Sequence, residues 1–78
     1  MREKKLWLII TFHTTTAAMA MESLCTEKGL PGRLIPVPRE ITAGCGMSWR
    51  APVESKAELI EAAEQAGIAA DGAYEIVI

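Results

Sequence analysis

Cysteine is scarce in this sequence, and its scarcity excludes one common design of small protein. The chain has two cysteines in 78 residues, whereas secreted domains of this size usually rely on several disulfides. We therefore expect free thiols and a reducing compartment, with the cytoplasm as the default. Basic residues are also few: 8 against 10 acidic ones, spread along the chain without a basic stripe that could follow a phosphate backbone. We expect no nucleic-acid partner.

Long hydrophobic runs are absent as well. The charged start is followed by the apolar run LWLII, but Thr11 and His13 interrupt it and no convincing small-residue cleavage site follows. We therefore interpret the run as a first strand and not as a signal peptide. No segment reaches the ~20 apolar residues of a membrane-spanning helix, and we expect no membrane partner. The sequence also has no phosphate-binding loop, G-x-S-x-G elbow, H-E-x-x-H zinc pair or C-x-x-C redox pair.

The sequence does contain enough apolar material for a packed core. Half of its residues are hydrophobic, so we expect one domain over residues 1–78. The apolar spacing predicts a β-α-β-β-α-β order. The predicted strands are residues 6–12, 33–39, 47–53 and 73–78, and the predicted helices run from residue 14 or 15 to 28 and from 55 to 67.

Each predicted helix has sequence signals at its ends. A threonine N-cap opens the first helix, and Gly29 closes it with Pro31 two residues later. Ser55 and Glu58 form a predicted capping box for the second helix, which stops at Gly67. The predicted inward faces are Ala17, Met21, Leu24 and Cys25 on the first helix and Leu59, Ile60, Ala63 and Ala66 on the second.

Two prolines place the second strand in the sheet. Pro36 and Pro38 lie two residues apart, so their missing N–H groups fall on the same side of the strand, which a sheet edge tolerates and its middle does not. Right-handed crossovers give the strand order 4-1-3-2, with this strand at an edge. We therefore predict an α+β fold, a ferredoxin-like βαββαβ sandwich with a four-stranded antiparallel sheet and two helices on one face. A three-layer doubly wound fold is disfavoured because residues 38–49 show no helix-length apolar pattern.

Cys45 is the one candidate nucleophile that this topology places in an activating setting. The turn after the first strand and the loop before the third share one end of the molecule, so residues 12–16 and 39–46 should be neighbours. A helix N-terminus and a nearby cation would favour the thiolate, and flanking glycines would leave room for a reacting partner. The candidate residues around this thiol are His13, Thr14, Thr15, Arg39, Gly44 and Gly46.

Each of these features also has a purely structural interpretation. Gly-Cys-Gly is equally well a turn in which Cys45 fills a small gap, and His13 serves at least as well as a donor to a strand-end carbonyl. Cys25, on an apolar helix face, is predicted to be a core residue and not a resolving thiol. Met19 and Met21 face different sides of their helix, which does not suit a soft-metal site. We predict no bound metal and no cofactor.

Two stretches, TFHTT at residues 11–15 and IPVPREITAGCG at residues 35–46, resemble a known family. Together with the rest of the chain they are similar to the selenium/sulfur carrier protein-like family. Cys25 matches no motif position, and Trp49 stands where an aliphatic residue is typical. The positions that match the family pattern are Thr11, Phe12, His13, Thr14, Thr15, Pro36, Pro38, Arg39, Cys45 and Gly46.

The resemblance implies that Cys45 carries a sulfane sulfur or a selenium atom as a persulfide or selenopersulfide. It implies a carrier or accessory protein more than an enzyme with turnover, with sulfur or selenium donor and acceptor proteins as partners. The predicted setting suits this chemistry, because Thr14, Thr15 and Arg39 would stabilise a terminal anion. One cysteine is enough for a carrier, whereas a disulfide oxidoreductase would use a second one close by.

Two other functions stay open at this stage. Ferredoxin-like sheets leave one face free of helices, and Trp7, Ile9 and Val77 would form an apolar patch there, as in a non-catalytic interaction or regulatory module that forms a homodimer through its sheet. The second alternative is a protein that binds a soft metal ion through Cys45 and His13, although it lacks the second cysteine that such sites prefer.

Overall fold

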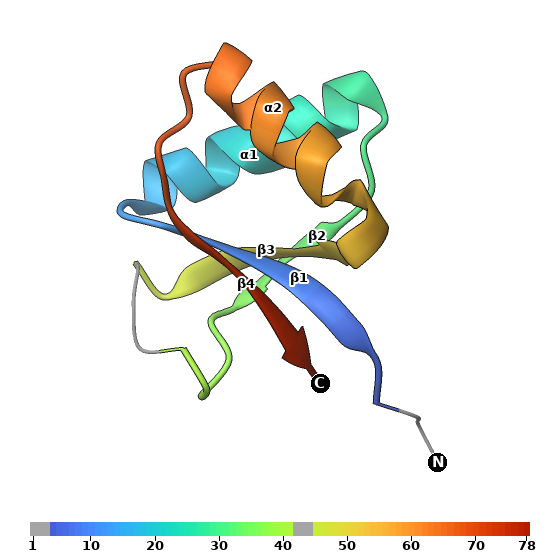
Figure 1. Cartoon of the computed structure of the whole chain (residues 1–78). Coiled ribbons are helices and arrows are strands. Elements are labelled where there is room, and N and C mark those ends of the chain that lie inside the picture. The colour runs from blue at the N-terminus through green and yellow to red at the C-terminus, as the bar shows by residue number, and fades with distance from the viewer. Residues whose placement is uncertain (1–3, 42–44) are drawn as a thin grey trace.

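Four strands form one antiparallel sheet, and two helices cover one of its faces (Figure 1). The structure is a computed structural model that describes residues 4–41 and 45–78. The sheet order is β2-β3-β1-β4, which is the predicted order counted from the other edge, and the ferredoxin-like α+β fold is confirmed. In chain order the elements are β1 Leu6–Phe12, α1 Thr15–Lys28, β2 Arg33–Pro36, β3 Met47–Pro52, the 3-10 helix η1 Val53–Ser55, α2 Lys56–Gln65 and β4 Ala70–Val77.

β2 lies at one edge of the sheet, as its prolines predicted. It pairs only with β3. Beyond Pro36, the N–H of Val37 donates to the Gly46 carbonyl oxygen at 3.0 Å. The nitrogens of Pro36 and Pro38, on either side of Val37, consequently face the free edge, where no ladder hydrogen bond is lost. β2 is shorter than predicted because Pro38 begins a turn, in which its carbonyl accepts from the N–H of Ile41 at 3.0 Å.

The hydrophobic core lies between the sheet and the helices. Alternate residues of β1, namely Leu8, Ile10 and Phe12, point toward the helices and are almost fully buried. Burying a side chain of this size contributes about 1.5–3 kcal/mol relative to its exposed state, so this one layer supplies a large share of the hydrophobic stabilisation. The other buried members of the core are Ala18, Met21, Cys25, Trp49, Ala51, Leu59 and Ala63.

The helix ends agree with the sequence signals in α1 and at the C-terminal end of α2, where Gly67 has a φ of +74°, but not at the N-terminal end of α2. Thr14 is the N-cap of α1, and its side chain accepts from the Ala17 N–H at 3.1 Å. Ser55 precedes α2 but makes no side-chain cap hydrogen bond, so the predicted capping box is wrong. The reason is that Ser55 ends η1 with φ −94° and ψ 6°, whereas a capping side chain needs extended backbone. Ala66, predicted to point inward, is exposed because α2 ends at Gln65.

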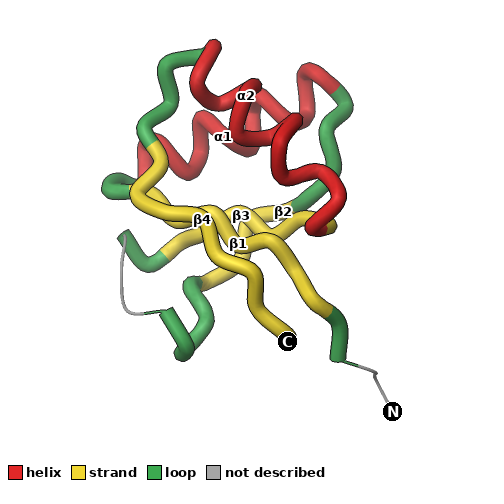
Figure 2. Tube along the Cα trace, in the orientation of Figure 1, coloured by secondary structure: helices red, strands yellow, loops and turns green. Residues whose placement is uncertain are grey.

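The sheet face opposite the helices does not carry the predicted apolar patch. Ile9 points to this face but is fully buried within the chain. Val77 pairs with Leu6, so its side chain lies on the helix side, and Ile76 is the residue beside Trp7. The segment that directly follows β2 lies below the sheet on this side in the view of Figure 2. The predicted patch of Trp7, Ile9 and Val77 is therefore wrong, and with it the apolar basis for a sheet-face dimer.

Neither helix in residues 4–41 and 45–78 combines the length and apolar composition that crossing a membrane would require.

Trp49 packs against a close backbone approach at Gly32. The Trp49 indole N–H donates to the Pro31 carbonyl oxygen at 3.2 Å. A Cβ at Gly32 would overlap the indole ring and would lie 2.7 Å from the Arg50 carbonyl oxygen. Gly32 also has a φ of +128°, a value that residues with a Cβ rarely adopt. This position therefore requires glycine.

Gly32→Ala is expected to lower the free energy of unfolding by about 3 kcal/mol or more, because overpacking and backbone strain act together. Urea unfolding followed by far-UV circular dichroism measures the change. Gly29→Ala is the matched control: Gly29 has φ +69°, but no atom would lie within 4 Å of its Cβ, so only the left-handed strain of about 1–2 kcal/mol remains. Equal losses in the two variants would contradict the packing role of Gly32.

Candidate functional site

The loop that leads to Cys45 is hydrogen-bonded at its base and in the turn that follows β2. Val37 and Gly46 join its two ends, and the Pro38–Ile41 hydrogen bond closes a turn within it. Ile41 is buried, so its side chain anchors this turn against the protein. Arg39 occupies the exposed corner of the same turn. The described part of the loop therefore has a defined conformation.

Cys45 is attached to the end of β1. Its N–H donates to the Phe12 carbonyl oxygen at 2.8 Å, so the loop meets the turn that opens α1. The two segments that topology predicted to be neighbours are in contact at this bond. The Cys45 side chain is half-buried against the edge of the core. Its Sγ lies 3.8 Å from the Met47 carbonyl oxygen, where the thiol is a weak donor.

Space is open beside the thiol on its C-terminal side. Gly46 is exposed and has a φ of +99°, and no atom would lie within 4 Å of a Cβ built on it. Gly46 therefore leaves open space directly after Cys45 in the chain. Gly44, the predicted glycine on the other side, lies outside the described residues.

The threonines at the start of α1 supply hydrogen-bond donors close to this loop. The oxygen of Thr14 accepts from the Ala17 N–H, which leaves the hydroxyl hydrogen free to donate. Thr14 and Thr15 are both exposed. The first intrahelical bond runs from the Ala18 N–H to the Thr14 carbonyl, so the N–H groups of Thr15 and Thr16 have no acceptor within the helix. This end of α1 can therefore stabilise an anion.

His13 forms its side-chain contact with a residue that the sequence did not single out. Its Nε2 lies 3.3 Å from Asp71 Oδ1, and the hydroxyl of Thr11 donates to Asp71 Oδ2 at 3.4 Å. β1 lies between β3 and β4, so His13 is directed to the β4 side whereas Cys45 leads into β3. The structure brings the backbone of His13 next to the loop but turns its imidazole toward Asp71.

Asp71 was missed because it precedes a glycine and so resembles an ordinary turn residue. It lies 58 positions after His13 in the sequence, and only the pairing of β4 with β1 joins the two. No local spacing pattern indicates such a contact.

Cys25 has the opposite environment to Cys45. It is buried at the centre of the helix-side core, with 1% of its surface exposed. Desolvation by burial raises the pKa of its thiol, so the neutral form persists at physiological pH. The prediction that Cys25 is a core residue is confirmed.

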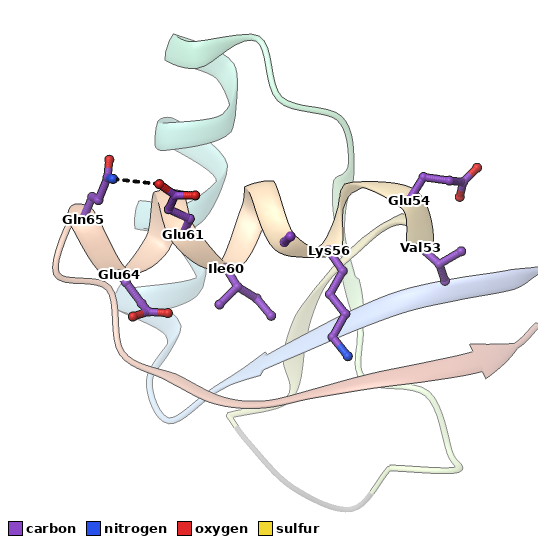
Figure 3. Close-up of a pocket in the computed structure, with 8 residues that line it drawn as sticks. Val53, Glu54, Lys56, Ile60, Glu61, Glu64 and Gln65 are labelled. Atoms are coloured by element: carbon purple, nitrogen blue, oxygen red, sulfur yellow. Dashed lines mark hydrogen bonds between the residues drawn. The ribbon is translucent and has the colours of Figure 1, made fainter.

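A recess along α2 does not coincide with these residues (Figure 3). Its lining comes from η1 and α2, with an apolar floor of Val53 and Ile60 and the carboxylates of Glu54, Glu61 and Glu64 around it. Within residues 4–41 and 45–78, no group of three or more His, Cys, Asp or Glu side chains could hold a metal ion. The hypothesis of a soft-metal site formed by Cys45 and His13 also loses its geometric basis, because the imidazole of His13 is turned toward Asp71 on β4.

Comparison with known proteins adds one match. A family model described as "Putative Se/S carrier protein-like" matches residues 8–75, a range that contains Cys45, His13 and Asp71. No curated protein and no solved structure was found to match the chain.

In the native protein, Cys45 should be alkylated by iodoacetamide about a hundredfold faster than Cys25 at neutral pH. The reason is that Cys25 reacts only when the core opens, and an opening that costs about 3 kcal/mol slows a reaction by roughly this factor. Peptide mass spectrometry after timed quenching measures both rates. In concentrated urea the two rates should converge. Equal rates under native conditions would contradict the assigned environments.

Proposed function

This chain belongs to the Se/S carrier protein-like family, and from that membership together with the geometry of its loop we propose that it carries sulfane sulfur or selenium on Cys45. The atom would be accepted from a donor protein, held as a persulfide or selenopersulfide, and handed to an acceptor protein.

The observation that carries this proposal is the hydrogen bond from the Cys45 N–H to the Phe12 carbonyl. It ties a half-buried thiol to the turn that opens α1, where donors and a positive dipole are available. A thiol on a surface loop, with open space at Gly46, is accessible to the active site of another protein. A buried thiol such as Cys25 would serve this purpose poorly.

The transfer step is a thiol exchange at the outer sulfur of the donor. The Cys45 thiolate attacks the terminal sulfur of a donor persulfide, so a bond forms from Sγ to that sulfur while the donor S–S bond breaks. The electron pair of the broken bond leaves with the donor sulfur as a thiolate, and the persulfide proton stays on the transferred atom or passes to solvent. No external oxidant or reductant is needed. Selenium transfer from a donor selenopersulfide balances in the same way.

The product carries a terminal anion, and the neighbouring groups suit it. The free hydroxyl hydrogen of Thr14 and the N–H groups at the start of α1 are donors of the required kind. Thr15 and Arg39 are both exposed, and Arg39 lies in the turn closed by Pro38 and Ile41. We assign Arg39 the role of a mobile countercharge that follows the outer atom. His13, oriented by Asp71, is in a position to exchange protons with a docked partner, since its imidazole is largely exposed.

A carrier explains the cysteine usage better than a disulfide oxidoreductase does. The second thiol of the chain, Cys25, is in the core, where it cannot resolve a disulfide at Cys45 without unfolding. One accessible thiol suffices when the cargo is passed directly to the next protein.

Incubation with a persulfide-loaded cysteine desulfurase should add about 32 Da to the protein, and a selenopersulfide donor should add about 80 Da. Intact-protein and peptide mass spectrometry should place the addition on Cys45. Cys45→Ser is expected to abolish it because the nucleophile is gone. Cys25→Ala is the matched control and should keep it, with circular dichroism to verify that the variant folds. Addition at Cys25, or none in the unaltered protein, would refute the carrier.

Arg39→Gln should slow persulfide acceptance by about two- to fivefold, because an exposed countercharge contributes up to about 1 kcal/mol to a nearby anion. Lys28→Gln removes the same charge from the far end of α1 and should leave the rate unchanged. The rates are measured by timed quenching and mass spectrometry at fixed donor concentration. If both variants slow the reaction equally, the effect is one of net charge and Arg39 has no specific role.

A further inference from the structure

The charged residues of the helical layer and of the opposite sheet face differ in sign. The net charge of −2 therefore conceals an uneven distribution of positive and negative side chains between the two sides of the molecule. Lys5, Arg33 and Arg50 share the sheet face opposite the helices with Trp7, and we call these four residues the cationic face. The charged residues of the helical layer are Glu22, Glu27, Glu54, Glu58, Glu61 and Glu64 against Lys28 and Lys56.

The ladder register places these side chains on one face. Arg33 pairs with Arg50, and Arg50 pairs with Ile9. Directly paired residues point to the same side of a sheet, and so do residues two apart on one strand. Ile9 and Trp7 lie two apart on β1, so both arginines share the face of Trp7. This is the face that the helices leave uncovered.

Two arginines stand side by side there. Like charges directly across a ladder are destabilising. Within residues 4–41 and 45–78, neither Arg33 nor Arg50 forms an ion pair. The Nε atom of Arg50 is buried and has no hydrogen-bond acceptor, which leaves a donor unsatisfied. The like-charge contact would be relieved by an anion placed against this pair.

Trp7 lies between two of the cations. The Lys5 Nζ is 4.6 Å and the Arg50 guanidinium carbon 4.4 Å from the centroid of its ring. Lys5 lies just before β1, whereas Arg50 pairs with Ile9, which follows Trp7. The backbones of the two cations therefore lie on opposite sides of Trp7 along the strand. Both cations contact the ring through cation–π interactions, and Trp7 is itself half-buried.

We propose that the cationic face is the docking surface for an acidic, carboxylate-rich segment of a partner polypeptide. The planar guanidinium groups of Arg33 and Arg50 bind carboxylates through paired N–H donors. Lys5 adds a third contact at the start of β1. The inference concerns partner recognition and does not depend on the chemistry of Cys45.

The spread of the charges favours an extended partner over a small anion. The cationic face crosses β2, β3 and β1, and neighbouring strands lie about 4.8 Å apart, so the contacts span about 10 Å. A single phosphate or carboxylate cannot reach all of them, whereas successive side chains of an acidic segment can.

Other macromolecules suit this face less well. Single-stranded nucleic acids rely on base stacking against free aromatic rings, and the ring of Trp7 is occupied by Lys5 and Arg50. A second copy of this chain would present its acidic helical layer, which is a head-to-tail contact that generates open chains of molecules unless the rotation happens to close. A separate acidic polypeptide meets neither difficulty.

The test uses a capped hexaglutamate peptide added to the intact protein at low salt. Two-dimensional NMR resolves the two indole N–H groups, which Trp7→Phe assigns. The Trp7 resonance should shift on titration while that of the buried Trp49 stays in place. Arg33→Gln and Arg50→Gln should each weaken binding by about fivefold, as expected for exposed charge pairs. Raising the salt to about 0.5 M should weaken it further, because the Debye length falls to about 4 Å.

Lys28→Gln is the matched control, since it removes one charge from the helical layer and should leave the peptide affinity unchanged. Arg33 is exposed on an edge strand, so its variant is expected to fold even if Arg50→Gln does not. Three other probes are run in parallel: inorganic phosphate, an oligothymidylate, and the protein alone in light scattering at high concentration. Equal binding of phosphate or oligothymidylate, self-association, or no Trp7 shift up to about 1 mM peptide would each overturn the proposal.

Discussion

The hydrogen bond between the Cys45 N–H and the Phe12 carbonyl is the contact on which the candidate site depends. It joins a loop that connects an edge strand to β3 with the last residue of a buried central strand. Phe12 is itself held in the core, so the bond transfers the rigidity of the core to the loop. Without it, the thiol would belong to a surface loop with no fixed relation to the start of α1.

The sheet divides the molecule into two chemical environments. On the helix side, close packing buries Cys25 and raises the pKa of its thiol. At the end of the sheet, Cys45 stays half-buried beside exposed polar groups. Two residues of the same type therefore differ in solvation, and burial disfavours the thiolate of Cys25. On the face opposite the helices, the sheet gathers Lys5, Arg33 and Arg50, while six carboxylates lie in the helical layer, so charge is segregated as well.

Several features of the fold could be predicted from the sequence because they depend on short-range pattern. The two prolines beside Val37 required an edge strand, the Thr14 N-cap and Gly29 bounded α1, and alternation in β1 identified its inward residues. The failures have equally local causes. Ser55 cannot cap α2 because η1 bends its backbone, and Ile9 is buried on a face that the strand pattern alone suggested was open.

The sequence by itself determined the β-α-β-β-α-β order, the edge position of the proline-bearing strand and the placement of Cys45 near the opening of α1, since periodicity, caps and crossover handedness are properties of neighbouring residues. Only the tertiary structure decided that His13 turns to Asp71 and that Arg33 stands beside Arg50. These pairs are distant in the chain, and they meet through the register of a sheet, which depends on how the whole core packs.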